Sequence, residues 1–533
     1  MKICFPLTVV LISVLALLAF NGSALADVIY VDCDAEGEED GTSWEDAFTT
    51  ITDGLDEATS GDEVWVAQGN YTENITLKAG VSLLGGFAGS GSTRDWNTWV
   101  TTIAKNGSAM VAVVAVPSNA TETCVIEGFT ITEGDYGAIL CLGSPTISHN
   151  VIHDNHTYFW GAILAVAGST ATIVNNLIYD NTNDWSGGGG IGIYGSPTIV
   201  NNTIADNDGL SGGGIYCQSG SPVIANNVIA FNKTGCGIWV AGGDPTLYNN
   251  NVYGNTDDSE DPCNYYNIDP GEDDISMNPL FVDRANEDYH IVGNSPCMDH
   301  GSNNAPDIPD LDIDMEERVD NDVVDIGYDE FDLGSEEEVC LNLNYVDGCA
   351  QLITLPGRAV DPDPWEVFDE LRPPNKAQDL LSGNLHRYDA VLNNWVTYWH
   401  SNPTPFGQIY PGAGYSLTIF DDETICYDAR VSYLSEATYF WPGEQWHLMG
   451  CPQTESVWIG DTEWYQYGDG PELFDDIKDV WVQDPLFHYD CDELTFVLLG
   501  LKVTDDEEDF RPFWAYWMYA FEANLVMVAP PGD

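Results

Sequence analysis

The sequence predicts an all-β protein: a parallel β-solenoid followed by a second β region. One observation is a phrase that recurs from residues 144, 170, 196, 221 and 244, as SPTISHNVIHDN, TATIVNNLIYDN, SPTIVNNTIADN, SPVIANNVIAFN and DPTLYNNNVYGN. Another is that short β-type runs alternate with Gly, Asn, Ser and Pro. Such a period is typical of stacked repeats whose single units are too small to form a core alone.

Aligned copies of the phrase place apolar residues in columns. Alternate residues of a strand point to the same face, so one column per strand is predicted to face the interior. These columns are Ile147, Ile173, Ile199, Ile224 and Leu247, then Ile152, Ile178, Ile204, Ile229 and Val252. The strand before each phrase adds Ile139, Ile163, Ile191, Ile215 and Ile238, and two residues on Cys141, Ala165, Ile193, Cys217 and Val240.

Two columns of Asn explain why the phrase recurs. They are Asn150, Asn176, Asn202, Asn227 and Asn250, then Asn155, Asn181, Asn207, Asn232 and Asn255. Asn tolerates left-handed turn geometry and can bond the backbone of its own turn or the Asn of the next coil. The phrase is therefore interpreted as the corner of a coil.

The first residues predict export. A positive start and an apolar run at 6–20 precede the small residues at 24–26, so residues 1–26 are predicted to be a secretory signal peptide. No later stretch is long and apolar enough for a membrane span. We therefore expect a secreted, extracellular or cell-surface protein.

A short helix is predicted soon after the signal peptide. Ser43 and Asp46 form a capping-box pattern, and Ile51, Leu55 and Ala58 recur at helical spacing with Phe48. Such a helix would close the open apolar end of the solenoid.

Segments at both ends of the solenoid resemble a known group. IYVDCDAEGEEDGTSWEDAFTTITDGLDEATSGDEVWVAQGNYTENITLKAGVSLLGGF (29–87) is similar to the opening of exported bacterial proteins with a right-handed parallel β-helix, the pectate-lyase-like fold. NPLFVD (278–283), NSPCMDHG (294–301) and VDIGYDEF (324–331) are similar to their closing segment. The resemblance covers residues 27–331 and implies a right-handed β-helix and export, without implying a reaction.

The composition changes after Phe331. Residues 332–533 hold 10 of the 17 Trp, and two halves of this region match. QLITLP (351–356) pairs with HLMGCP (447–452), RYD (387–389) with HYD (488–490), and YPGAGYSLTI (410–419) with RPFWAYWMYA (511–520). We predict a duplicated, β-sandwich-like region with modules at 332–435 and 436–533. Its aromatic residues suit a core, with glycan binding as the alternative.

The charge excludes one class of partner. The chain has 86 acidic and 15 basic residues, a formal charge of −71, so it lacks the basic face that nucleic-acid binding needs. Such charge favours solubility, and attraction of divalent cations is the alternative. The cysteines suit an oxidising compartment but do not reveal their pairing. Cys141 and Cys217 would lie three coils apart, roughly 14 Å, so they are predicted to be buried thiols.

Two acidic groups are candidate sites. Asp154, Asp180 and Asp206 form a column on three coils, which can be a solvated face, a cation site or a set of catalytic acids. Asp310, Asp312 and Asp314 alternate in DLDIDMEERVDND, a spacing that can wrap calcium, although Met315 stands where an EF-hand loop has Gly. For both groups a solvated acidic surface is the leading interpretation.

Two aromatic residues are the candidate carbohydrate-binding site. Tyr216 and Trp239 fall between inward positions on adjacent coils, so both are predicted to face outward. Exposed aromatic faces suit the apolar faces of sugar rings, but packing beneath a loop is the leading interpretation of these two residues.

The leading functional interpretation is a non-catalytic β-helix protein that binds or displays at the cell surface and contacts polysaccharide. The alternative is a carbohydrate-active enzyme on the same scaffold. Residues 124–277 contain one basic side chain, Lys233, which disfavours a lyase that needs a base. An inverting glycoside hydrolase needs only two carboxylates, so that enzyme class stays open.

Overall fold

A computed structural model describes residues 26–331, with gaps at 109, 159–160, 186, 294 and 320–322, and beyond residue 331 only separate segments. Of the predicted signal peptide, residues 1–25 lie outside the described part. None of the helices in the described part is long and apolar enough to cross a bilayer.

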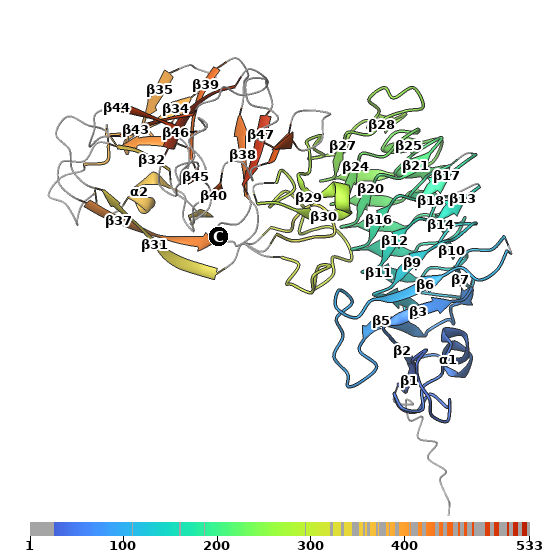
Figure 1. The fold of residues 1–533 in the computed structure, drawn as a ribbon. Helices are drawn as coiled ribbons and strands as arrows, with labels where there is room; N and C mark the ends of the chain where they lie inside the picture. The colour runs from blue at the N-terminus through green and yellow to red at the C-terminus, as the bar shows by residue number, and fades with distance from the viewer. Residues whose placement is uncertain are drawn as a thin grey trace, which may run out of the picture.

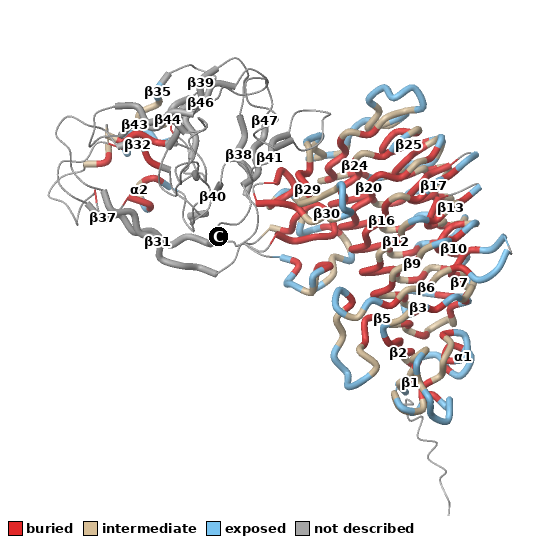
Figure 2. The backbone as a smooth tube through the Cα atoms, viewed as in Figure 1, coloured by how far each residue is buried: buried red, intermediate tan, exposed pale blue. Residues whose placement is uncertain are grey.

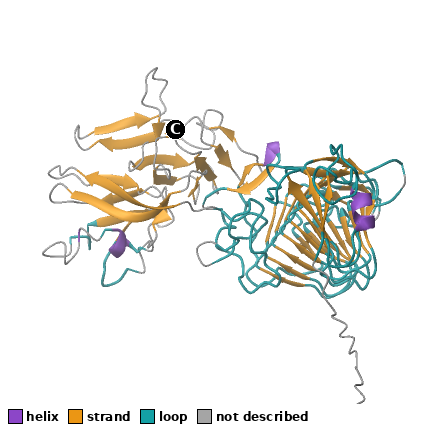
Figure 3. Ribbon diagram, turned by 90° about the horizontal axis from the view of Figure 1, so that it is seen from below, coloured by secondary structure: helices purple, strands orange, loops and turns teal. Residues whose placement is uncertain are grey.

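Residues 28–266 wind into a solenoid of three long parallel sheets, seen along its side in Figure 1 and from below in Figure 3. Sheet A contains β1 (Val28–Val31), β2 (Glu63–Ala67), β5 (Ser82–Phe87), β8 (Val125–Glu127), β11 (Thr146–Ser148), β15 (Thr172–Val174), β19 (Thr198–Val200), β23 (Val223–Ala225) and β26 (Thr246–Tyr248). Sheet B contains β3 (Gly69–Thr72), β6 (Thr101–Ala104), β9 (Thr130–Thr132), β12 (Val151–His153), β16 (Leu177–Tyr179), β20 (Thr203–Ala205), β24 (Val228–Ala230) and β27 (Asn251–Tyr253).

The third sheet forms the remaining long side of each coil. Sheet C contains β4 (Ile75–Thr76), β7 (Val114–Val116), β10 (Ile139–Cys141), β14 (Ile163–Ala165), β18 (Ile191–Ile193), β22 (Ile215–Cys217), β25 (Ile238–Val240) and β28 (Tyr265–Tyr266). A short fourth sheet contains β13 (His156–Thr157), β17 (Thr182–Asn183) and β21 (Asp208–Gly209).

The predicted apolar columns form the core. Each aligned pair is in register, for example Ile173 with Ile199 in sheet A and Ile191 with Ile215 in sheet C. Every residue of the four predicted columns is buried, and Figure 2 shows the buried positions running along the strands. Cys141 and Cys217 are buried free thiols, as predicted.

The Asn columns form two continuous hydrogen-bonded ladders. In one of them, the Asn202 side-chain amide donates to the Ile173 and Val200 carbonyls and to Asn227 Oδ1. Its own Oδ1 accepts hydrogen bonds from the backbone and side-chain nitrogens of Asn176. The ladders therefore satisfy buried polar groups at two corners of the coils between residues 150 and 255.

The left-handed residue of each corner is the one before the ladder Asn, not the ladder Asn itself. One corner has His149, Asn175, Asn201, Asn226 and Asn249 at positive φ. The other has Asp154, Asp180, Asp206, Phe231 and Gly254. Asn, Asp and Gly tolerate this geometry best, which explains eight of these ten residues.

A short helix covers the N-terminal end of the solenoid. Helix α1 (Ile51–Glu57) packs against β1, β2 and β4, and it buries Ile51 and Leu55. The predicted helix therefore exists, but its cap was misplaced. Thr50 accepts the N-terminal hydrogen bond from Asp53, whereas Ser43 and Asp46 bond each other in a preceding turn.

A closing segment, residues 278–331, lies lengthwise along the solenoid. It includes β29 (Phe281–Asp283), the 3-10 helix η1 (Arg284–Asn286) and β30 (Asp288–Ile291). Its apolar residues form a core with the outward side chains of sheet B, including Tyr179, Ala205 and Val228. The outer face of sheet B is therefore buried from β16 to β27.

The C-terminal region contains small antiparallel sheets. The first part comprises β31 (Ser335–Leu343), β32 (Gln351–Thr354), β33 (Arg358–Ala359), α2 (Pro364–Val367), β34 (Leu385–Asp389), β35 (Asn394–Thr397), β36 (Gly414–Leu417) and β37 (Glu423–Val431). The second comprises β38 (Glu436–Phe440), β39 (Gln445–Gly450), β40 (Val457–Trp458), β41 (Glu463–Tyr465), β42 (Glu472–Leu473), β43 (Leu486–Asp490), β44 (Thr495–Leu499), β45 (Asp509–Phe510), β46 (Ala515–Ala520) and β47 (Leu525–Ala529).

The two parts repeat one strand order. A four-stranded sheet β32-β36-β34-β35 corresponds to β39-β46-β43-β44, and the matching sequence phrases fall on β32 with β39, β34 with β43, and β36 with β46. These two sheets lie against each other, because β32 and β36 contact β39 and β46. The region is thus a duplicated antiparallel β structure, and the domain boundaries at 331 and 435 stay a prediction.

Candidate functional site

The acidic column lies at a corner of the coil. Asp154, Asp180 and Asp206 have φ values of 52°, 46° and 56°, so they are the left-handed residues of three successive corners. Asp is favoured there because its short polar side chain can bond locally. The backbone geometry alone accounts for an Asp at each position.

Arg284 of the closing segment forms an ion pair with Asp206. Its side chain is buried, and its two oxygens accept hydrogen bonds from Arg284 Nη2 at 2.5 Å and Nε at 2.7 Å. Tyr289 Oη donates to it at 3.2 Å, and Lys233 Nζ lies 3.5 Å away. Arg284 also lies over the Phe231 ring, 3.8 Å from its centroid. These contacts leave Asp206 poorly suited to bind a cation or transfer a proton.

The other two members of the column differ from it. Asp154 is exposed and its carboxylate lies 2.9 Å from His153 Nδ1. Burial, and then the nearby Asp206 carboxylate, raise the pKa of Asp180. The column therefore contains a buried carboxylate paired with Arg284, a partly buried one, and an exposed one beside His153.

The three alternate Asp residues of the closing segment have separate partners. Asp312 is buried, and its oxygens accept backbone N–H groups from Asp314, Glu316 and Glu330. Asp314 accepts from the Asn97 side chain and lies 3.2 Å from His290 Nε2, whereas Asp310 is exposed. Asp312 therefore stabilises a turn, and its donors occupy the oxygens that a calcium ion would need.

Asp314 belongs to a second acidic group with His290 and Asp329, whose ligand atoms lie within 4.8 Å of one another. Burial would lower the pKa of His290, but hydrogen bonds to the Asp288 and Asp314 carboxylates raise it to about 11. The surrounding carboxylates thus favour the protonated form of His290. In that form it pairs with Asp288 and Asp314, and a metal ion would have to displace a proton to bind the ring.

Tyr216 and Trp239 lie where the sequence placed them. They are paired in register on β22 and β25 of sheet C, and both are half-buried and outward, between the buried inward positions. The Tyr216 hydroxyl donates to Gln218 Oε1 at 2.5 Å, so this ring leans along its own strand. The two residues therefore form one outward step on adjacent coils.

Tyr266 is a third aromatic residue of this column, which the sequence analysis missed. It pairs in register with Trp239, and the two rings stack with centroids 3.7 Å apart at 16°. Its side chain is 46% exposed. One face of Trp239 is therefore already covered by Tyr266. The available signal was the spacing of 27 residues from Trp239, close to the repeat, although the repeated phrase has ended there.

Sheet C keeps an accessible outer face. Its outward residues Leu140, Leu164, Tyr216 and Trp239 are half-buried and Tyr266 is exposed, whereas the closing segment buries the outward residues of sheet B. We define the aromatic column as Tyr216, Trp239 and Tyr266. It lies on the face where an extended ligand can approach several coils at once.

Comparisons with known proteins found a matching family model and a similar solved structure. Residues 94–257 match the family model of the right-handed β-helix region. The chain is also similar to the crystal structure of pectate lyase Pel9A, at 12% sequence identity and a TM-score of 0.38. The matched region covers 58% of this chain and 97% of the pectate lyase chain. No curated protein matches the chain. The family-model match and the parallel pairing of the three sheets show a right-handed parallel β-helix.

Proposed function

We propose that this protein is an exported or cell-surface β-helix protein that binds neutral polysaccharide through sheet C without cleaving it. The observation that carries the proposal is the aromatic column of Tyr216, Trp239 and Tyr266 on the accessible outer face. Aromatic side chains offer apolar surface to sugar rings, and their polar groups can pair with hydroxyls. Binding would be weak for each ring and would increase with chain length.

The charge of the chain favours a neutral ligand. A formal charge of −71 repels a polyuronate, and the loop before β28 adds Asp257, Asp258 and Asp261 beside the same sheet. Exposed carboxylates can still accept hydrogen bonds from sugar hydroxyls. A polysaccharide without acidic groups therefore fits this surface better than polygalacturonate.

Two observations support export. The apolar leader at residues 1–26 has the pattern of a secretory signal peptide. Cys236 and Cys263 form a disulfide, and disulfides persist in oxidising compartments outside the cytosol.

The state of the acidic column favours binding over catalysis. An inverting hydrolase needs a carboxylic acid and a free carboxylate base on opposite sides of the scissile bond. Asp206 is held by Arg284, and Asp180 and Asp154 occupy a corner beside sheet B rather than the aromatic column. The enzyme alternative depends on Asp180, whose pKa is raised.

Affinity electrophoresis tests the binding proposal. The full chain is run in gels that contain xylan, glucomannan, mixed-linkage β-glucan or, with chelator, polygalacturonate. We expect retardation by a neutral glycan, and we expect the Tyr216→Ala, Trp239→Ala double variant to lose it while keeping its circular dichroism spectrum. Trp185→Ala removes a 65% exposed Trp of the solenoid outside the aromatic column and is the matched control. Equal retardation of parent and double variant, or strong retardation by polygalacturonate, would contradict the proposal.

A reducing-sugar assay on the same glycans tests the alternative. We expect no release of reducing ends by the parent. Release that disappears in Asp180→Asn would instead identify a hydrolase with Asp180 as its acid.

A further inference from the structure

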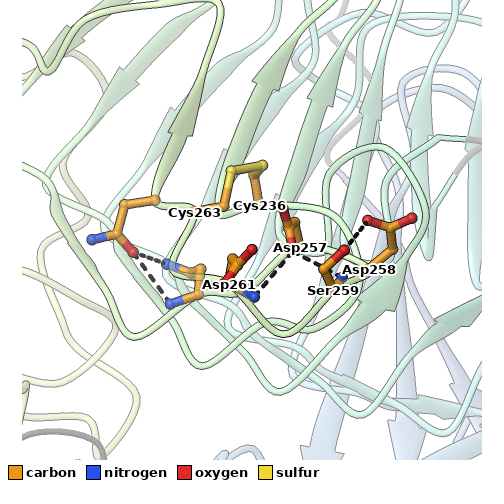
Figure 4. The surroundings of a disulfide bond; sticks show 8 residues. Cys236, Asp257, Asp258, Ser259, Asp261 and Cys263 are labelled. Atoms are coloured by element: carbon orange, nitrogen blue, oxygen red, sulfur yellow. Dashed lines mark hydrogen bonds between the residues drawn. A yellow bond between two sulfur atoms is a disulfide. The ribbon is translucent and has the colours of Figure 1, made fainter.

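The last strand of sheet C is attached by a covalent link. Strand β28 contains only Tyr265 and Tyr266, and it pairs with Ile238 and Trp239 of β25. Cys236 and Cys263 are bonded, and their separation of 27 residues equals the register offset of both strand pairs. The disulfide is therefore one more rung of the same register, three residues before Trp239 and Tyr266. Figure 4 shows it where the two coils meet.

The hydrogen bonds around the disulfide fix the same alignment. Gly237 N donates to the Cys263 carbonyl and Ile238 N to the Asn264 carbonyl, both at 2.9 Å. Asn264 Oδ1 accepts from the backbone and side chain of Asn255, so it ends one of the Asn ladders. A strand of two residues makes few bonds of its own, so its position depends on these flanking contacts.

Tyr266 ends the aromatic column. One face of its ring stacks on Trp239, and β28 is the last strand in the order of sheet C. Tyr266 therefore covers one side of Trp239. Among the described residues, no further strand of sheet C follows Tyr266. Its exposed ring surface is the part of the column that a flat sugar ring can cover.

We propose that Tyr266 is the terminal sugar-stacking residue of the aromatic column and that the Cys236–Cys263 disulfide positions it. The ligand is a neutral pyranose ring of a polysaccharide, with its apolar face on the Tyr266 ring. This inference rests on the proposed function and adds a contact and a positioning pair to it. Asp257, Asp258 and Asp261 lie beside the same disulfide, and their charge disfavours a uronate near it.

The test uses the full chain in affinity gels with xylan, glucomannan or β-glucan. Tyr266→Ala should weaken retardation roughly three- to tenfold, as expected for the loss of one stacked ring, and Tyr266→Phe should keep it. The Cys236→Ser, Cys263→Ser double variant should weaken it to a similar extent. Adding Tyr266→Ala to that variant should cause little further loss, because both changes remove the same contact.

The outcomes separate this inference from the proposed function. If Tyr216→Ala, Trp239→Ala abolishes retardation but Tyr266→Ala binds like the parent, the role of Tyr266 is wrong and the binding face stands. If Tyr266→Ala weakens retardation but the Cys double variant is retarded like the parent, the disulfide does not position the ring. If no neutral glycan retards the parent, both proposals fail. The Tyr266→Ala and Tyr266→Phe pair keeps the test decisive even where the Cys variant folds poorly.

Discussion

Replacing one ladder Asn should destabilise the solenoid far more than its size suggests. Asn202 is fully buried, and Asn202→Ala removes a side chain that bonds two backbone carbonyls and two ladder neighbours. It also removes the acceptor of the Asn176 backbone N–H. Asn176 and Asn207 bond their neighbouring coils in the same way, so a similar cost is expected at those positions.

The expected cost follows from these bonds. Each lost hydrogen bond contributes about 0.5–1.5 kcal/mol net, and a buried N–H left without an acceptor costs about 1–3 kcal/mol. Some partners keep other bonds, since Asn176 Nδ2 still donates to the Ile147 and Val174 carbonyls. The sum is roughly 3–5 kcal/mol, a large share of the stability of an ordinary domain.

Urea unfolding followed by circular dichroism measures this cost as a shift of the midpoint. Asn74→Ala is the matched control, because Asn74 is half-buried and, among the described residues, its hydrogen bonds are to Asn106 in a loop. We expect the control to stay within about 0.5 kcal/mol of the parent. An Asn202→Ala midpoint equal to that of the control would refute the view that the ladder stabilises the coils.

Three further outcomes are expected. Ile199→Asp places an unpaired carboxylate in the core and should cost several kcal/mol; melting within a degree or two of the parent would mean that the strand register is wrong. Chelator at fixed ionic strength should leave the melting temperature unchanged, because backbone N–H groups occupy the Asp312 oxygens; a lower temperature would indicate a bound cation. Burial raises the pKa of Asp329 to about 7 from 3.8, so its contribution to stability is complete below about pH 4 and is lost as the pH rises towards 7. Urea titrations should show a steeper fall over this range for the parent than for Asp329→Asn, and parallel curves would contradict the assignment.

The repeat made much of the solenoid predictable from sequence. Columns of Ile and Asn report burial and corner position directly, because each coil repeats the environment of the coil before it. Ile199 and Asn202 are buried as the alignment requires. The right hand of the helix came from the resemblance of the end segments, not from the spacing.

The candidate site was less predictable, because its environment comes from segments outside the repeat. Arg284 and Asp206 are 78 residues apart in the sequence, and the repeat does not indicate that they pair. Tyr266 lies in a last coil that has lost the repeated phrase, and cysteine counting does not identify Cys236 with Cys263. The closing segment covers sheet B and leaves sheet C accessible. The columns of the repeat do not predict which sheet the segment covers.

The contacts of the closing segment also constrain how many coils can lie between the residues it bonds. Its carbonyls accept from Trp96 at Ile313 and from Asn201 at Gly327, and its Arg284 reaches Asp206. These anchor points lie on different coils, so the number of coils between them fixes the distance that the closing segment must span. Duplicating or deleting one 25-residue unit between them would move the anchors apart by one strand spacing, about 4.8 Å. Repeat proteins usually change length by gaining or losing whole units. In this protein such a change would keep the contacts of the closing segment only if it fell outside the coils between the anchor points.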